Sequence, residues 1–334
     1  MNRLQTPSPC DRSLRVAASA LFASAVLAAC APPAADDAAA VSLDSASDTA
    51  APVEATSLLG QPLRRPAFSA ETRQRLEANL DTARASYERT PSDADSIIWL
   101  GRRLAYLGRY RDAIATFGEG IREHPDDARM YRHRGHRWIT VRQLDSAVAD
   151  LSRAAELIRG QPDVVEPDGA PNRFDIPTST LQSNIWYHLG LAHYLRGDFE
   201  QALEAYRECM RVSANDDMRV ATADWLYMTL RRLERGDEAA RVLEPIHADM
   251  RILENDAYHR RLLMYKGELP ADSLLAGDGA DALQMATQGY GVGNWYLYEG
   301  DTTRAREIFE RVMSYGNWAA FGHIAAEAEL VRMR

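Results

Sequence analysis

The chain has 334 residues, of which 46% are hydrophobic and 26% are charged, the proportions of an ordinary globular protein. Its formal net charge of −9 argues against a general nucleic-acid binder, which would carry a basic surface, although it leaves room for a local basic groove. Of the three cysteines, Cys10 and Cys30 lie in an amino-terminal targeting region, so only Cys209 belongs to the folded part. An intramolecular disulfide framework is therefore excluded there.

The first 29 residues have the features of a secretory signal. Three arginines precede an apolar run over 16–27, which has the length of a signal-peptide core and is too short to span a bilayer stably. The run ends in Leu27-Ala28-Ala29-Cys30, which resembles the lipobox of bacterial lipoproteins. The resemblance implies cleavage before Cys30, acylation of its sulfur and anchoring in a membrane through lipid. The alternative is a soluble secreted protein in which this cysteine is incidental.

Residues 30–67 are expected to form a flexible tether between the lipid and a folded domain over 68–334. The tether is rich in Ala, Pro, Ser and Asp and has no aromatic residue, so it cannot bury enough apolar surface to order itself. Ala31, rather than an aspartate, follows the cysteine. In bacteria with the usual sorting rule, the resemblance then implies an envelope protein of the outer membrane that faces the periplasm.

Most of the folded part follows a repeat pattern, and its first two copies, which begin at Gly101 and Gly135, are 34 residues apart. A small residue is followed twelve positions later by an alanine and four positions after that by a large apolar residue. The pattern occurs as Gly101/Ala113/Phe117, Gly135/Ala147/Leu151, Gly190/Ala202/Tyr206 and Gly293/Ala305/Phe309. Two helices that cross closely need a small residue at the crossing, and a large residue one turn further fills the gap. The pattern therefore predicts an all-α stack of helical hairpins.

The segment Trp186-Tyr187-His188-Leu189-Gly190, followed by Tyr194, Gly197, Ala202 and Tyr206, resembles the tetratricopeptide (TPR) repeat closely. The resemblance implies a right-handed superhelical solenoid that binds protein or peptide partners, without a cofactor and without enzymatic activity. We expect a lone helix over about 70–89 before the repeats. The repeats are predicted at about 94–127, 128–160, 183–216, 218–253 and 286–317, of which the fourth is a weaker copy.

Three segments depart from the repeat pattern. The first is a loop insertion over 160–182 that contains four prolines and cannot be helical throughout; Phe174 and Ile176 suggest that it packs as an ordered flap. The second is an irregular segment over 255–281. The third, 318–334, is predicted to be a capping helix, with an apolar face formed by Phe321, Ile324, Ala325, Ala328 and Val331.

No catalytic constellation emerges from the sequence. His133 and His136 are three residues apart, a spacing that can hold a metal, but no further ligand is positioned, so no metal site is predicted. Gly289–Gly293 is glycine-rich, yet no strand precedes it, which favours close helix packing over phosphate binding. Cys209 occupies a small-residue position and no base is placed beside it. The sequence therefore predicts neither an enzyme nor a small-molecule substrate.

In TPR proteins the first helix of each hairpin lines the concave surface, so the resemblance implies a set of inward side chains. Registering each first helix on its small residue gives Arg102, Tyr106, Arg129, Arg132, His136, Tyr187, Tyr194, Tyr290, Asn294 and Tyr298. These residues predict a groove with an arginine-rich end and a tyrosine-rich end, which receives an extended acidic peptide or a chain terminus.

Two alternatives to this groove remain open. Arginine is abundant throughout the chain, with Lys266 as the only lysine, and codon bias in a GC-rich genome would produce the same excess. The second alternative is a structural subunit of an outer-membrane or cell-wall assembly, which docks through its convex face and the 160–182 insertion. Whether the chain binds a segment in the groove or docks into an assembly, the predicted partners are a protein and, through the lipid on Cys30, a membrane. Nucleic acid is not among the predicted partners.

Overall fold

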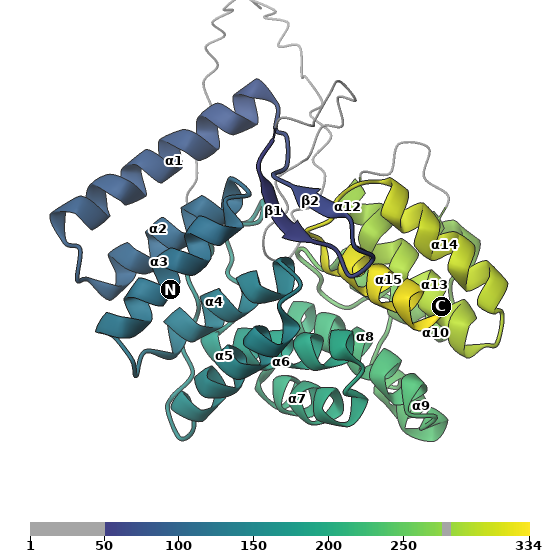
Figure 1. Cartoon of the computed structure of the whole chain (residues 1–334). Coiled ribbons are helices and arrows are strands. Elements are labelled where there is room, and N and C mark those ends of the chain that lie inside the picture. Colours follow the sequence, from purple (N-terminus) through teal and green to yellow (C-terminus); the bar gives the residue numbers. More distant parts are fainter. Residues whose placement is uncertain (1–50, 276–281) are drawn as a thin grey trace, which may run out of the picture. The chain divides into compact units, whose positions relative to one another are not determined.

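The computed structural model describes residues 51–275 and 282–334 (Figure 1). The predicted signal peptide, Cys30 and the last part of the irregular segment, 276–281, lie outside the described residues. The described chain is an all-α helical repeat solenoid with one short β-hairpin. In chain order its elements are β1 (Val53–Thr56), β2 (Pro62–Arg64), α1 (Ala70–Arg89), α2 (Ala94–Tyr106), α3 (Tyr110–Glu123), α4 (Ala128–Thr140), α5 (Leu144–Leu157), α6 (Leu181–Arg196), α7 (Phe199–Val212), α8 (Asp216–Arg232), α9 (Gly236–Leu243), α10 (Asp256–Tyr265), α11 (Ala271–Leu275), α12 (Ala282–Gln284), the π-helical turn η2 (Met285–Gly289), α13 (Tyr290–Tyr298), α14 (Thr302–Ser314) and α15 (Phe321–Arg332).

The helical hairpins are closed at the small residues that the spacing rule singled out. Gly190 on α6 lies against the ring of Tyr206 on α7, so close that a Cβ added to the glycine would lie 2.7 Å from Cε1 of that ring. A Cβ on Gly293 of α13 would lie 2.6 Å from Cε1 of Phe309 on α14, and Gly101 and Gly135 meet their partners in the same way. The predicted cause of the pattern, close crossing of paired helices, is confirmed.

The turn inside each hairpin requires a left-handed backbone conformation. Gly108 and Gly197 supply it after the first helices of their hairpins, with φ of 70° and 92°. Arg142 takes the equivalent position between α4 and α5 with φ of 64°, a conformation that costs a residue with a side chain about 1 kcal/mol or more. The side chain of Arg142 forms a buried ion pair, which is described below.

The carboxyl-terminal helix α15 does more than cover the end of the solenoid. It packs on α14 and also reaches α6, and its Glu327 is fully buried against the α4–α5 turn. Arg142 donates from Nη2 to Oε2 of Glu327 at 2.8 Å, and the backbone N–H of Leu58 donates to Oε1 of the same carboxylate. Val331, predicted on the apolar face, is exposed instead, whereas residues 322–330 of α15 are all buried.

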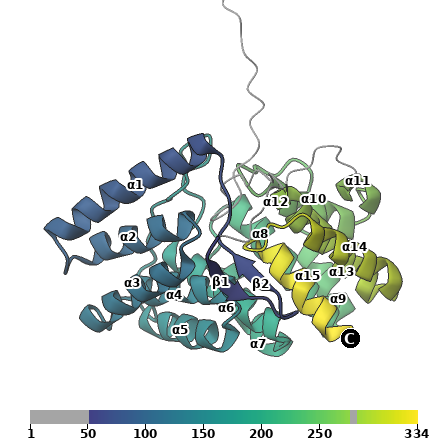
Figure 2. The same ribbon diagram turned by 45° about the horizontal axis from the view of Figure 1, so that its top comes forward.

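The segment expected to be a tether as far as residue 67 contains structure in its described part. Strands β1 and β2 pair antiparallel, with Ala55 and Leu63 in the apolar interior. The hairpin is held to the helices by polar contacts: Arg111 Nε donates to the carbonyl of Glu54 at 2.7 Å, and Trp318 Nε1 donates to the carbonyl of Arg64 at 2.8 Å. Figure 2 shows the hairpin beside α15. These partners are distant in sequence, so composition alone could not indicate them.

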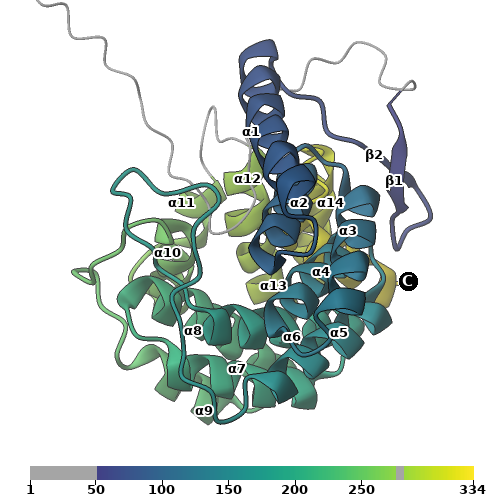
Figure 3. The ribbon, with the colours of Figure 1, turned by 90° about the vertical axis from the view of Figure 1, so that its left-hand side faces the viewer.

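Residues 160–182, which we call the strap, are placed in the structure as an extended segment, the teal loop that rises beside α8 and α10 in Figure 3. Val165 and Thr180 form an isolated β-bridge at its base. The residues that suggested packing, Phe174 and Ile176, are 46% and 42% exposed, so that part of the prediction is wrong. Polar residues hold the strap instead, as the next subsection describes.

In the part of the chain that the structure describes, no helix combines the length and the apolar character needed to cross a membrane.

The glycine crossings give a direct test of the fold. We expect Gly190→Ala to lower the free energy of unfolding by about 1–3 kcal/mol, because the added methyl group would overlap the buried Tyr206 ring. Gly118→Ala is the matched control: a Cβ there lies 3.5 Å from Arg134 Nη1, an ordinary contact, and should stabilise α3 by about 0.5–1 kcal/mol. Urea denaturation measures both, and equal effects of the two substitutions would contradict the packing.

Candidate functional site

The arginine-rich end of the predicted groove lies on the inner helices α2 and α4, beneath the strap. Arg102 and Arg132 are both buried. Arg132 Nε lies 3.1 Å from Oε2 of Glu166, a strap residue that is itself buried, and the second oxygen of Glu166 lies 3.8 Å from His133 Nε2. The structure thus brings Arg102 and Arg132 together and places the carboxylate of Glu166 against Arg132.

Two backbone carbonyls of the strap accept hydrogen bonds from neighbouring arginines of α2. Arg102 Nη1 donates to the carbonyl of Pro167 at 2.8 Å, and Arg103 Nη1 donates to the carbonyl of Gly169 at 2.9 Å. The predicted groove residue Tyr106 receives a hydrogen bond from Arg102 Nη2 at 3.3 Å. A Cβ on Gly169 would collide with the Tyr106 hydroxyl, so the strap backbone lies directly against α2 at Gly169.

The histidines of α4 are part of the packed inner layer. His133 stacks on Phe117 with ring centroids 5.5 Å apart, and His136 lies 4.3 Å from the ring of His188. Burial, followed by neighbouring arginines, lowers the pKa of His133 and of His136 well below the ordinary histidine value, so both are neutral at pH 7. Over 51–275 and 282–334, no three His, Cys, Asp or Glu side chains converge as a metal site would require.

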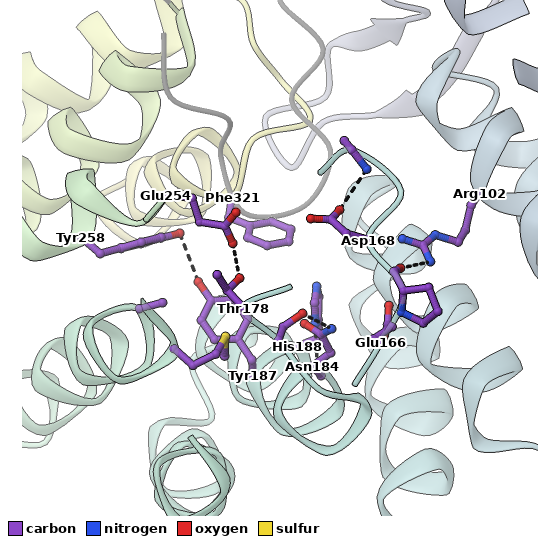
Figure 4. Close-up of a pocket in the computed structure, with 15 residues that line it drawn as sticks. Arg102, Glu166, Asp168, Thr178, Asn184, Tyr187, His188, Glu254, Tyr258 and Phe321 are labelled. Atoms are coloured by element: carbon purple, nitrogen blue, oxygen red, sulfur yellow. Dashed lines mark hydrogen bonds between the residues drawn. The ribbon is translucent and has the colours of Figure 1, made fainter. Parts of the chain in front are cut away.

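A cleft that is partly open to solvent lies between the strap, α6, α8 and α10 (Figure 4). The hydroxyls of Tyr187 and Tyr258 are hydrogen-bonded at 3.1 Å on one side of it. Phe321, from the start of α15, contributes an aromatic ring. The other residues that line the cleft are Arg102, Glu166, Pro167, Asp168, Ala170, Thr178, Ser179, Asn184, His188, Met218, Ala221 and Glu254.

Glu254 anchors the far half of the strap beside this cleft. Its carboxylate accepts a hydrogen bond from Thr178 Oγ1 and another from Asn172 Nδ2, the latter at 3.0 Å. Partial burial of the side chain raises the pKa of Glu254 above its ordinary value. Polar contacts therefore hold both halves of the strap: Glu166 of the first half pairs with Arg132, and residues of the second half donate to Glu254.

The predicted tyrosine-rich end of the groove lies mostly in the interior of the protein. Tyr194, Tyr290 and Asn294 are all 0% exposed. The hydroxyl of Tyr290 and Nδ2 of Asn294 both donate to the hydroxyl of Tyr194 at 2.9 Å, so the three side chains form one buried hydrogen-bonded cluster. They are buried because α6 and α13 approach each other around Trp225, and no partner can touch them without rearrangement.

The two remaining predicted residues lie apart from the cleft. Arg129 is partly exposed and pairs with Asp127 and Asp95, each at 2.6 Å, so it links neighbouring hairpins. Tyr298 is half-buried, and its ring lies 4.3 Å from the guanidinium carbon of Arg231. The structure thus gathers Arg102, Tyr106, Arg132, His136 and Tyr187 around the strap and the cleft and leaves the other five elsewhere.

Sequence reasoning missed Glu166, Glu254, Tyr258 and Phe321. All four come from segments outside the repeats: the strap, the start of the irregular segment and the terminal helix. The break in the 34-residue period was the signal that such segments exist. It carried no information on which of their side chains turn inward.

The buried histidines lead to a pH prediction. Their folded-state pKa values lie below the unfolded value of about 6.5, so the unfolded chain binds more protons and stability falls as the pH drops below about 6.5. Between pH 7.5 and 5.5 the unfolding free energy of the variant His133→Gln/His136→Gln should fall by about 2–3 kcal/mol less than that of the wild type. A double variant with an unchanged slope would contradict neutral, buried imidazoles.

Comparison with known proteins places these hairpins in a family context. Residues 183–216, which cover α6 and α7, match the model of the tetratricopeptide repeat. Among curated proteins, BBSome complex member BBS4 from Bos taurus is 24% identical over 160 residues, 47% of this chain and 27% of that protein. The Mus musculus protein of the same name is 22% identical over 158 residues, 46% of this chain and 26% of that protein. The chain therefore spans about a quarter of the length of these relatives.

Solved structures of helical repeat proteins are similar at a lower level. A tetratricopeptide repeat protein from Parabacteroides merdae has a TM-score of 0.45 and 13% identity, covering 77% of this chain and 93% of that one. YrrB, a TPR protein with an unusual peptide-binding site, has a TM-score of 0.41 and 14% identity, covering 76% and 100%. These likenesses do not extend to function. The match identifies residues 183–216 as a tetratricopeptide repeat, which lies here within a series of similar helical hairpins.

Proposed function

We propose that this chain is a non-enzymatic scaffold that binds a protein or peptide segment on its inner surface, in the cleft between the strap, α6, α8 and α10. The observation that carries the proposal is the lining of the cleft, which combines aromatic side chains with polar tips, Tyr187 and Tyr258, with the guanidinium of Arg102 and the carboxylates of Asp168 and Glu254. Such a mixture offers contact area and directional hydrogen bonds together, which suits a peptide segment.

The chemistry of the one thiol in the described residues supports a role without catalysis. Cys209 is fully buried on α7, and its sulfur contacts the hydroxyl of Thr222 at 3.2 Å. Burial raises the pKa of this thiol to about 12. A thiol that stays protonated and covered is a packing group rather than a nucleophile.

The scaffold would be held at the cell envelope by lipid on Cys30. The lipobox-like sequence Leu27-Ala28-Ala29-Cys30 supports this part of the proposal. Acyl chains on the sulfur and on the new amino terminus together would anchor the chain firmly. Ala31 after the cysteine favours the outer membrane with the domain in the periplasm.

A photo-crosslinking amino acid in place of Tyr258 tests binding in the cleft. We expect it to give a discrete crosslinked partner in cells, and we expect Ala170→Trp to remove the crosslink because an indole at this exposed lining position would block the cleft. Arg173→Trp is the control: it adds the same ring at an exposed strap residue that does not line the cleft. The same crosslinks with and without the blocked cleft would contradict the proposal.

Lipidation has a separate test. Cells fed an alkyne-labelled fatty acid should label the wild-type protein, and Cys30→Ala should abolish the label and release the protein from the membrane fraction. Cys10→Ala serves as the control and should change neither result. Membrane association of Cys30→Ala at the wild-type level would contradict a lipid anchor.

A second candidate function is docking into an envelope assembly through the outer face of the strap. Of the six exposed large apolar residues in the described chain, four lie on the strap: Val164, Val165, Phe174 and Ile176. Exposed apolar side chains grouped on one segment are typical of a contact surface. Loss of the Tyr258 crosslink in Val165→Ser/Phe174→Ser, with Ala170→Trp harmless, would favour this function over binding in the cleft.

A further inference from the structure

The strap is not needed to build the solenoid. Gly135 and Gly190 are 55 residues apart instead of 34, so the strap interrupts the repeat, yet α5 packs directly against α6 across the interruption. The apolar residues of the strap are exposed; Val165, for example, is 60% exposed. Removal of the strap would therefore uncover little of the apolar core.

The contacts that hold the amino-terminal half of the strap are those of a bound acidic peptide. One carboxylate, Glu166, pairs with the buried Arg132 of α4. The next two contacts are made by backbone carbonyls, those of Pro167 and Gly169, and both carbonyls accept from arginines of α2. The chain runs extended between these points. This kind of recognition needs one carboxylate and two backbone carbonyls. An extended segment of another protein can offer the same groups.

Two cavities lie against α2. The larger is the cleft described above, and the smaller is lined by Arg102, Ala105, Tyr106, Phe117, Arg132, His133 and Arg137. Arg102 lines both cavities, so the cavities meet at the guanidinium that holds Pro167. Movement of the strap away from α2 would uncover Arg102 and Arg132 of the predicted groove, which both line the smaller cavity.

Charge determines what could replace the strap. Arg102, Arg132 and Arg137 all line the smaller cavity, and without the Glu166 carboxylate a buried guanidinium would lose the anion that lies beside it. A buried charge that loses its partner is strongly unfavourable, so the groove has to be refilled by another anion or by water.

We infer that the strap is an internal ligand, and that the partner on the inner surface supplies an extended acidic segment that displaces it. The segment carries a carboxylate in the place of Glu166. Three residues later it carries a glycine, because a Cβ in the place of Gly169 would collide with the Tyr106 hydroxyl and would lie 2.8 Å from Arg102 Nη2. This inference rests on the proposed function in assuming that the partner binds the inner surface.

The probe for this inference is a fluorescent peptide with the sequence of residues 163–172, added to the full chain. The variant Gly169→Leu keeps every arginine but forces its own strap away from Tyr106. We expect this variant to bind the peptide about tenfold more tightly than the wild type does, because the tethered strap competes at a high effective concentration. Fluorescence anisotropy measures both dissociation constants.

Two controls and one replacement variant sharpen the test. Arg173→Leu places a leucine at an exposed position of the same strap and should bind the peptide as weakly as the wild type. The peptide with Glu166→Gln should bind Gly169→Leu at least several-fold more weakly, since it lacks the charge that meets Arg132. If Gly169→Leu does not fold, Glu166→Gln in the protein replaces it, since it removes the charge and keeps the size of the side chain. The inference would be overturned if the wild type and Gly169→Leu (or its replacement Glu166→Gln) bound the peptide with equal affinity, or if neither variant bound it.

The inference and the proposed function fail separately. If the peptide binds the opened variant but Tyr258 gives no specific crosslink, the strap is an internal ligand and the proposed function is wrong. If the crosslink at Tyr258 has the same yield in the wild type and in Gly169→Leu, the scaffold function stands and the partner does not compete with the strap.

Discussion

A guanidinium removed from water has to be paired, and this constraint fixes the parts of the protein that the repeats do not. Three buried ion pairs each join a repeat to a segment outside the repeat pattern: Arg132–Glu166 to the strap, Arg142–Glu327 to α15 and Asp224–Arg261 to α10. Loss of one member of such a pair typically costs about 3–5 kcal/mol, because its partner is left as a buried charge. The excess of arginine, which codon bias alone would explain, is thus put to structural use in at least these three places.

The repeats could be predicted from the sequence because the contacts that define them are local and periodic. A glycine and the ring that it meets, such as Gly190 and Tyr206, are sixteen residues apart in one hairpin, and the same spacing recurs at Gly293 and Phe309. The lone helix α1 was equally visible, since it occupies the predicted range of 70–89. Each of these features depends on residues that the sequence places close together.

The candidate site depends on contacts across long sequence distances, which the pattern does not contain. Glu327 meets Arg142 at a separation of 185 residues, and this return of α15 toward α4 and α6 brings Phe321 into the cleft. Alignment of α6 on Gly190 predicted Tyr194 on the inner surface, as expected for a regular solenoid. In the structure α13 packs against that surface and buries the tyrosine. The β-hairpin before α1 escaped notice for the same reason: its partners lie in distant helices and in Trp318.

The inner surface of this solenoid is therefore occupied by its own chain, and its capacity to bind depends on how firmly the strap is held. Hydrogen–deuterium exchange of the strap amides in the wild type and in Glu166→Gln measures this most directly. The Glu166 amide donates to the carbonyl of Ser179 and the Leu181 amide to that of Val164, so both should be protected in the wild type. The account predicts that Glu166→Gln speeds exchange at these amides while the amides of α2 and α4 keep their rates. Equal strap protection in both proteins would contradict it.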